Sequence, residues 1–304
     1  MSKPALHVAE AGPLTTVQDL GRPGLASLGV PESGALDPRA LELANRLVGN
    51  PEEAPGLEVT FGGLRLTARR PVVLAVTGAP VLVTVDGAAA GLGCAVAIPA
   101  GSTVRLGSPR YGVRSYLALR GGVLADRVLG SASTDLLAGI GAPLADGDDL
   151  DVGAAPDTDV PVVDAVPLST PTGEELVLRV VLGPRDDWFT DEAVELLLDS
   201  EWTVESRSNR IGIRLTGPTL HQRQKRELPS EGTIAGSLQV PHNGQPTLFL
   251  ADHPITGGYP VIAVVHTADL PRLAQARPDQ TLRFRQVSAP RLAGQRHESA
   301  AGSR

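Results

Sequence analysis

Short runs of β-forming apolar residues alternate along this chain with segments rich in glycine, proline and polar residues. Runs of this length, bounded by turn residues, are typical of strands rather than helices. We therefore predict a mainly β protein with many short strands. The predicted strands are Ala5–Val8, Leu57–Phe61, Leu64–Thr67, Val72–Thr77, Val81–Val85, Ala95–Ile98, Thr103–Leu106, Ser115–Leu119, Leu176–Leu182, Trp202–Glu205, Ser206–Thr216, Leu248–Leu250, Val261–Val265 and Thr281–Gln286.

Helices are expected at only a few places. Asp37 followed by Pro38 is a good helix start, because the carboxylate caps the first turn and proline suits the first helical position. Apolar residues then recur at helical spacing until Gly49. Thr190 is expected to cap a helix over Asp191–Asp199, and Asp269 to begin a short one.

One segment separates two strand-rich regions. Residues 154–175 are rich in proline, aspartate and threonine and have no clean periodicity. Such composition is typical of a linker. We predict a first β subdomain over 1–153, the linker over 154–175, a second β subdomain over 176–288 and a disordered tail over 289–304.

Composition excludes several classes of protein. The net charge is −7, and no basic cluster with interleaved aromatic residues occurs, which argues against nucleic-acid binding. The chain has one cysteine, Cys94, so no intrachain disulfide can form; its apolar neighbours predict a buried structural thiol. The six histidines are scattered, and no pair of them has a spacing that indicates a metal site. No secretion signal or membrane-length apolar run is present, so we expect a cytoplasmic protein away from membranes.

The segment between Gln239 and Pro260 contains the strongest candidate chemistry. It connects two apolar runs through a loop rich in glycine, proline and polar residues, a common place for functional sites. Asp252 can accept a hydrogen bond from a substrate N–H, or it can be a turn residue at the end of a strand. His253 can be a general base whose tautomer is fixed by a carboxylate, or an exposed loop histidine.

Other polar residues offer weaker signals. Alternation over 206–216 places Arg210 and Arg214 on one strand face, where they can clamp a carboxylate or simply face solvent. Gln18 and Asp19 form an acceptor pair or a surface turn. Ser33 has no visible base partner and is interpreted as a turn or ligand-contact hydroxyl.

Several long motifs together resemble one family. The chain is similar, over residues 5–288, to biotin-dependent carboxyltransferases, also called the allophanate hydrolase subunit 2 family. Its members include the C subunit of bacterial 5-oxoprolinase and an antagonist of a sporulation-kinase inhibitor. The motifs that carry the resemblance are LTTVQDLGRPG (Leu14–Gly24), the stretch Gly29–Gly63, LGPRDDWFT (Leu182–Thr190), SRSNRIGIRLTGP (Ser206–Pro218) and the stretch from Ser230 to Val265.

This resemblance implies a fold, an activity and partners. The fold would be two cyclophilin-like β-barrel subdomains. The activity would be that of an ATP-dependent 5-oxoprolinase, which opens 5-oxo-L-proline to L-glutamate. The partners would be the B subunit of that enzyme, a protein of the allophanate hydrolase subunit 1 family, and a third hydrolase subunit. The substrate would be a small-molecule amide, and the chain is expected to be inactive alone.

Two other activities are compatible with the family. One is carboxyl transfer from carboxybiotin to urea or another amide, and the other is non-catalytic antagonism of a kinase inhibitor. ATP would be used by the complex, although the chain has no classical nucleotide-binding motif. The chain also lacks an Ala-Met-Lys-type attachment lysine, so no covalent biotin is expected.

The resemblance and the loop together suggest a site. Asp252 would hold the lactam or amide N–H, and backbone N–H groups of the loop glycines would face a developing oxyanion. The sequence His253-Pro254-Ile255 departs from the Arg-Gln-Thr common in the family, so the chemistry of this loop can differ. The predicted catalytic residues are Asp252, His253 and Tyr259; the predicted substrate-binding residues are Gln239, Asn243, Thr256, Gly257, Gly258, Arg210 and Ser33.

Overall fold

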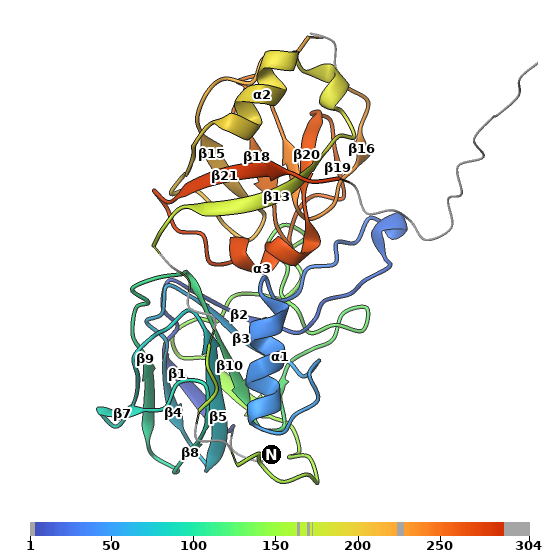
Figure 1. Cartoon of the computed structure of the whole chain (residues 1–304). Helices are drawn as coiled ribbons and strands as arrows, with labels where there is room; N and C mark the ends of the chain where they lie inside the picture. The colour runs from blue at the N-terminus through green and yellow to red at the C-terminus, as the bar shows by residue number, and fades with distance from the viewer. Residues whose placement is uncertain (1–3, 163–164, 169–170, 172, 224–227, 289–304) are drawn as a thin grey trace, which may run out of the picture.

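Two β-rich units lie end to end (Figure 1). The computed structural model describes residues 4–162, 165–168, 171, 173–223 and 228–288. The described part of the predicted linker forms no helix or strand and lies against the first unit: the N–H of Val166 donates to the carbonyl of Gly93 at 2.9 Å. The predicted tail, 289–304, is outside the described residues.

The first unit is built from two sheets. A seven-stranded sheet has the order β11-β12-β1-β4-β9-β6-β7, and a five-stranded sheet has the order β2-β3-β10-β5-β8. The elements are β1 (Leu6–Glu10), β2 (Leu14–Gln18), the 3₁₀ helix η1 (Ala26–Leu28), α1 (Pro38–Leu47), β3 (Gly56–Thr60), β4 (Arg65–Ala68), β5 (Val72–Gly78), β6 (Val83–Val85), β7 (Ala88–Ala90), β8 (Ala95–Ile98), β9 (Thr103–Leu106), β10 (Arg114–Leu119), β11 (Val123–Leu124) and β12 (Asp149–Val152).

Helix α1 begins where the sequence predicts. The carboxylate of Asp37 accepts a hydrogen bond from the N–H of Ala40 at 3.1 Å, and Pro38 occupies the first turn. The helix buries Ala40, Leu41 and Ala44, and it packs mainly against β5 and β10. Its apolar stripe therefore covers one face of the five-stranded sheet, and its N-terminus points toward the second unit (Figure 1).

The second unit is a closed barrel with the strand order β13-β20-β17-β18-β15-β14-β21. Its last strand pairs with its first in parallel, with Leu178 opposite Phe284, and pairs with β14 in antiparallel. The elements are β13 (Leu176–Leu182), η2 (Asp186–Trp188), α2 (Asp191–Asp199), β14 (Trp202–Val204), β15 (Gly212–Thr216), β16 (Glu231–Gly232), β17 (Ser237–Gln239), β18 (Thr247–Phe249), β19 (Thr256–Gly257), β20 (Val261–Val265), η3 (Thr267–Asp269), α3 (Leu270–Leu273) and β21 (Thr281–Gln286).

Each unit has its own apolar core. In the barrel, Trp202 is fully buried, and its indole N–H donates to the carbonyl of Leu197 at 3.1 Å, so its one polar atom is satisfied. The core of the first unit consists almost entirely of valine, leucine and alanine between its two sheets. The low aromatic content of the sequence is therefore compensated by many small branched side chains.

The predicted mainly β class with a few short helices is confirmed, and several strands have the predicted bounds. The strand predicted for 206–216 is wrong in its first half, because β15 starts only at Gly212. There, the hydroxyl of Ser208 donates to the carbonyl of Glu205, and the side chain of Asn209 accepts from the N–H of Ile211. Such local side-chain bonds compete with strand pairing. Cys94 is partly exposed rather than buried.

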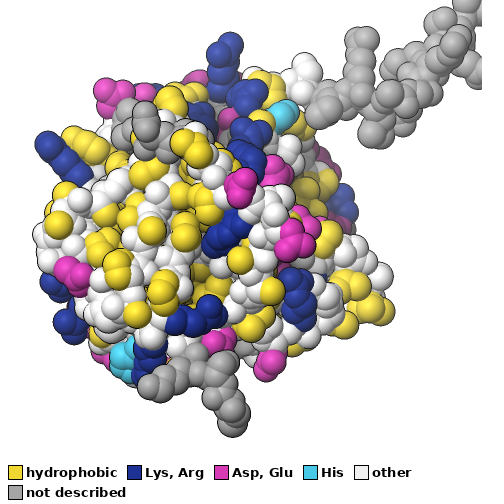
Figure 2. Space-filling view, turned by 90° about the horizontal axis from the view of Figure 1, so that it is seen from below, with side chains coloured by type: hydrophobic (Ala, Val, Ile, Leu, Met, Phe, Trp, Pro, Cys, Tyr) yellow, Lys and Arg dark blue, Asp and Glu magenta, His cyan; other side chains and the backbone are white. Residues whose placement is uncertain are grey.

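The end of the first unit that faces away from the barrel is shown in Figure 2. Among the described residues on this face, hydrophobic side chains are spread widely, and charged side chains of both signs lie between them, both near the middle and toward the edge. Within the described ranges, no helix is long and apolar enough to cross a membrane, and no cluster of metal-ligating side chains is found.

Two loops of the first unit approach each other closely below the barrel. Gly34 has a φ of +91°, and a Cβ atom added there would lie 2.9 Å from the backbone nitrogen of Gly21. Gly21 in turn has a φ of +85° and lies against the carbonyl of Glu32. Glycine is therefore required at both positions, because each has a left-handed backbone angle and neither has space for a Cβ atom.

We expect Gly34→Ala to destabilise the protein by more than the backbone angle alone explains. A left-handed alanine costs roughly 1–2 kcal/mol, and the steric conflict adds about 1–3 kcal/mol. Gly24→Ala is the matched control, since Gly24 has a φ of +83° with nothing within 4 Å of an added Cβ. Chemical denaturation of both variants measures the difference, and equal losses would show that the close approach is unimportant.

Candidate functional site at the junction of the two units

A buried ion network joins the two units. Arg210, just before β15 of the barrel, is 0% exposed. Its Nη1 donates to Oε1 of Glu58 on β3 of the first unit at 2.6 Å. Its Nε and Nη2 donate to both oxygens of Asp252 at 2.9 and 2.8 Å, and Nη2 also donates to the carbonyl of Gly34 at 2.7 Å. One guanidinium thus binds two carboxylates and a loop.

The carboxylate of Asp252 is fully engaged inside the protein. Besides the two bonds from Arg210, it accepts from the hydroxyl of Ser33 at 2.8 Å and from the N–H of Leu136 at 3.1 Å. Asp252 is 0% exposed. In this arrangement Asp252, Arg210 and Ser33 bind one another, and the substrate contacts predicted for them stay predictions.

The local alternatives for these residues have different outcomes. Arg210 does not lie on a solvated strand face, because it is buried, although it does clamp a carboxylate, that of Asp252. Asp252 does lie in a turn after β18, as that alternative predicts, but the partners of its carboxylate come from distant parts of the chain. Gln18 and Asp19 are buried too; Asp19 accepts from the hydroxyl of Ser131 at 2.5 Å and so ties two loops together.

Glu58 anchors the network in the first unit. Besides Arg210, it faces Arg114 at 3.4 Å and accepts from the hydroxyl of Tyr116 at 2.8 Å. Burial raises the pKa of Glu58, but the charges of Arg210 and Arg114 lower it by a larger amount. The pKa therefore lies below its ordinary value. Burial first, and then Glu58, raises the pKa of Tyr116 well above normal, so its hydroxyl remains a donor.

His253 lies directly after the network residue Asp252. It is 7% exposed, so the alternative of an exposed loop histidine is wrong. Its ring stacks on Phe249 with centroids 6.0 Å apart, and Nδ1 lies 2.8 Å from the carbonyl of Pro254. A carbonyl can only accept, so Nδ1 carries the proton and Nε2 is left as an acceptor. The tautomer is set by a backbone carbonyl, not by the predicted carboxylate.

A cavity of about 530 Å³ opens beside His253. Its walls come from both units: the loop that contains η1, the loop after Leu136, and the segment His253–Thr256 of the barrel. Because both halves of the wall are tied to the ion network through Ser33, Leu136 and Asp252, the cavity depends on the junction being intact. The lining residues are Ala26, Ser27, Gly29, Pro31, Leu137, Ala138, His253, Pro254, Ile255 and Thr256.

The remaining predicted residues lie outside the lining of this cavity, all within the described part of the chain. Gln239 is buried, and its Nε2 donates to the carbonyl of Tyr259 at 3.1 Å. The ring of Tyr259 is partly exposed and meets His242 edge-on at 5.4 Å. Asn243 accepts from the N–H of Gln245 within its turn. Catalytic or substrate-binding roles for these residues stay predictions.

The two glycines of the loop are placed as follows. Gly257 belongs to β19, which pairs with β16, and a Cβ added there would meet the side chain of Gln239 at 2.3 Å. Gly258 follows it, where an added Cβ would have ordinary van der Waals contact. A side chain at 257 would therefore require the amide of Gln239 to move, and the predicted oxyanion contact of the backbone stays a prediction.

Sequence reasoning missed Glu58, Arg114 and Tyr116. The available signal was a lone glutamate inside the apolar strand Gly56–Thr60, where all the residues except Thr60 are buried. A charged side chain in such a strand needs a buried partner of opposite charge. The sequence alone does not show that this partner would be Arg210, 152 positions further along the chain.

We expect Glu58→Gln to destabilise the protein by about 3–5 kcal/mol, because it leaves Arg114 without its buried counter-charge and leaves Arg210 with Asp252 as its one remaining carboxylate partner. Glu10→Gln is the matched control: Glu10 pairs with Arg65 on the surface at 2.8 Å, and an exposed pair contributes about 0–1 kcal/mol. Urea unfolding of the two variants compares them. Similar losses for both would contradict a special role for the buried pair.

The same glutamate predicts how stability depends on pH. Its folded pKa is lowered, so its contribution is fully present above the unfolded pKa of about 4.3 and is lost as pH falls through the folded value. The difference in unfolding free energy between the native protein and Glu58→Gln should therefore be constant near neutrality and shrink below about pH 4. Denaturation at several pH values measures it; a difference that grows in acid would reverse the assignment.

Comparison with known proteins gives the family. A model described as "Carboxyltransferase domain, subdomain A and B" matches residues 28–286. The C subunit of 5-oxoprolinase from Escherichia coli (strain K12) is 40% identical over 287 residues, covering 93% of this chain and 91% of that protein. The protein of the same name from Haemophilus influenzae is 35% identical and covers 93% and 92%. Urea amidolyase of Saccharomyces cerevisiae is 31% identical, covering 92% of this chain but 16% of that protein.

Solved structures agree with this family assignment. The crystal structure of TTHA0988 superposes with a TM-score of 0.83 at 38% identity, covering 94% of this chain and 56% of that one. The K. lactis urea amidolyase gives a TM-score of 0.87 at 31% identity, covering 95% and 19%. This chain therefore spans about half of the first solved chain and a fifth of the second. The resemblance inferred from the motifs is confirmed, and the chain belongs to the family defined by the carboxyltransferase domain, subdomains A and B.

Proposed function

We propose that this chain is the C subunit of a hetero-oligomeric, ATP-dependent 5-oxoprolinase, which converts 5-oxo-L-proline to L-glutamate. The observation that carries the proposal is the match in length as well as sequence: more than nine-tenths of both chains align with the E. coli and H. influenzae subunits. The urea amidolyases align over the same part of this chain, but this chain spans less than a fifth of the length of those proteins. Carboxyl transfer to urea is therefore the less supported alternative.

The proposed activity divides the work among several chains. The B subunit would complete the site, and a third hydrolase subunit would be needed for turnover. Opening a stable lactam requires activation, and ATP hydrolysis by the complex would supply it. The sequence of this chain contains no phosphate-binding loop motif, and we assign it no nucleotide site.

The cavity beside His253 is the part of the chain best suited to an amide. A lactam presents one N–H donor and one carbonyl acceptor. In our proposal, the unprotonated Nε2 of His253 accepts from the N–H, and the hydroxyl of Thr256 is available to the carbonyl. Asp252 acts one step back, holding the loop against Arg210 without touching the substrate.

The subunit assignment is tested by reconstitution. We expect this chain to co-purify with the B subunit, and ATP-dependent formation of glutamate from 5-oxoproline to require both of them and the hydrolase subunit. Each component is omitted in turn as the control. A stable complex that turns over no 5-oxoproline would remove the proposal and favour an antagonist or carboxyltransferase role.

His253→Asn tests the role of the cavity in the same reconstituted complex. Asparagine places its amide nitrogen where Nδ1 lies, so the bond to the carbonyl of Pro254 can persist while Nε2 is lost. We expect activity to fall by about 100-fold or more if Nε2 exchanges a proton with the substrate. His221→Asn, at an exposed histidine, is the control. Unchanged activity in His253→Asn would exclude Nε2 from the reaction.

A further inference from the structure

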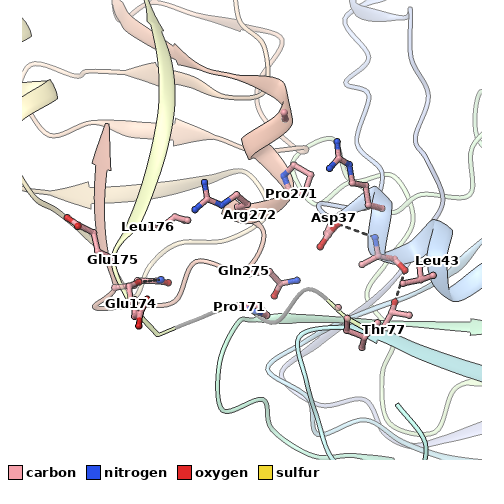
Figure 3. A pocket seen from close by; sticks show the side chains of 16 residues that line it. Asp37, Leu43, Thr77, Pro171, Glu174, Glu175, Leu176, Pro271, Arg272 and Gln275 are labelled. Carbon is pink, nitrogen blue, oxygen red and sulfur yellow. Dashed lines mark hydrogen bonds between the residues drawn. The ribbon is translucent and has the colours of Figure 1, made fainter. Parts of the chain in front are cut away.

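A second cavity lies between the two units and shares no lining residue with the one beside His253. Its volume is about 510 Å³, within the range typical of small-molecule sites, which often form where domains meet. Figure 3 shows the start of α1 on one side, α3 on another and the segment leading into β13 on a third. Nothing in the proposed reaction uses this cavity.

Much of its wall is apolar. Leu43 of α1, Leu176 at the start of β13 and Pro271 of α3 all border the space (Figure 3). These three residues come from both units, so a molecule that filled the cavity would contact the first unit and the barrel together. An apolar body of a few carbon atoms is the kind of ligand portion that such a wall favours.

The carboxylate of Asp37 borders the same space. One oxygen accepts from the N–H of Ala40, the capping bond of α1. Burial, and to a smaller extent the charge of Glu58, raise the pKa of Asp37 more than the hydrogen bonds from Ala40 and Gln275 and the charge of Arg39 lower it. The charged form is therefore incompletely compensated by its surroundings, and a cationic or N–H donor group in the cavity would improve its environment.

Positive charge lies on the same walls. Arg39 follows Asp37 on the exposed side of α1, and it forms no ion pair with any residue of the described ranges. Arg272 of α3 is half-exposed, donates to the carbonyl of Val177 at 2.8 Å and lies 3.7 Å from Asp269. The cavity thus combines guanidinium groups and an apolar wall with three carboxylates, those of Asp37, Glu174 and Glu175, of which Glu175 is paired with Arg283.

We propose that this cavity is a binding site for a small zwitterion, a free α-amino acid with an aliphatic side chain. Its ammonium group would pair with Asp37 and its carboxylate with Arg39, while its side chain would lie against Leu43 and Leu176. Neither charge of the ligand would then be buried without a partner. The proposal does not depend on the proposed reaction, because binding is measured on this chain alone.

Three probes of one size separate the contributions. L-Leucine carries both charges, 3-methylbutylamine lacks the carboxylate, and 4-methylpentanoate lacks the ammonium group. We expect leucine to bind in isothermal titration calorimetry with the full chain, and each trimmed probe to bind at least about tenfold more weakly, the usual consequence of losing a charged hydrogen bond. The absence of leucine binding, or equal binding of 4-methylpentanoate, would overturn the proposal.

Asp37→Asn tests the site without removing the helix cap, since asparagine caps as well as aspartate. We expect this variant to keep its melting temperature and to bind leucine at least about tenfold more weakly. Arg39→Gln should weaken the binding of leucine but leave the binding of 3-methylbutylamine unchanged. Glu192→Gln, at an exposed position on α2, is the control and should bind as the native chain does. Native affinity in Asp37→Asn would overturn the assignment.

Discussion

The structure depends on one buried cation. The guanidinium of Arg210, in the barrel, binds a carboxylate of the first unit, and it does so without contact with water. A buried guanidinium must be neutralised, and two carboxylates from different units do this together. The ion pairs of Arg210 with Glu58 and Asp252 therefore fix the orientation of the two units, in addition to apolar contacts.

Several features of the site follow from this arrangement. The loop that contains Ser33 and the loop after Asp135 reach Asp252 through hydrogen bonds, and His253 is the next residue along the chain. The cavity beside His253 is thus lined by the same loops that form this junction. The junction also extends to the other cavity: the backbone N–H of Asp37 donates to the hydroxyl of Tyr116, which donates to Glu58.

Local structure could be predicted from the sequence, whereas the junction could not. Strand bounds such as Val261–Val265, and the capped start of α1 at Asp37, depend on neighbouring residues and are correct. The sequence also indicates that the loop around Asp252 is important, but it does not show that this carboxylate pairs with Arg210. A polar residue in a loop has the same local sequence whether it faces a ligand or a distant arginine. Only the three-dimensional pairing of Asp252 with Arg210 distinguishes the two.

The closure of the barrel has a consequence for the order of folding during synthesis. Strand β21 bridges β13 and β14, so the barrel cannot close until residue 286 has left the ribosome. The first unit, whose strands end at Val152, can form its sheets much earlier. Until then Glu58 and Arg114 have only each other as partners of opposite charge. The nascent chain must therefore keep the surface around Glu58 hydrated until Arg210 arrives to exclude the water.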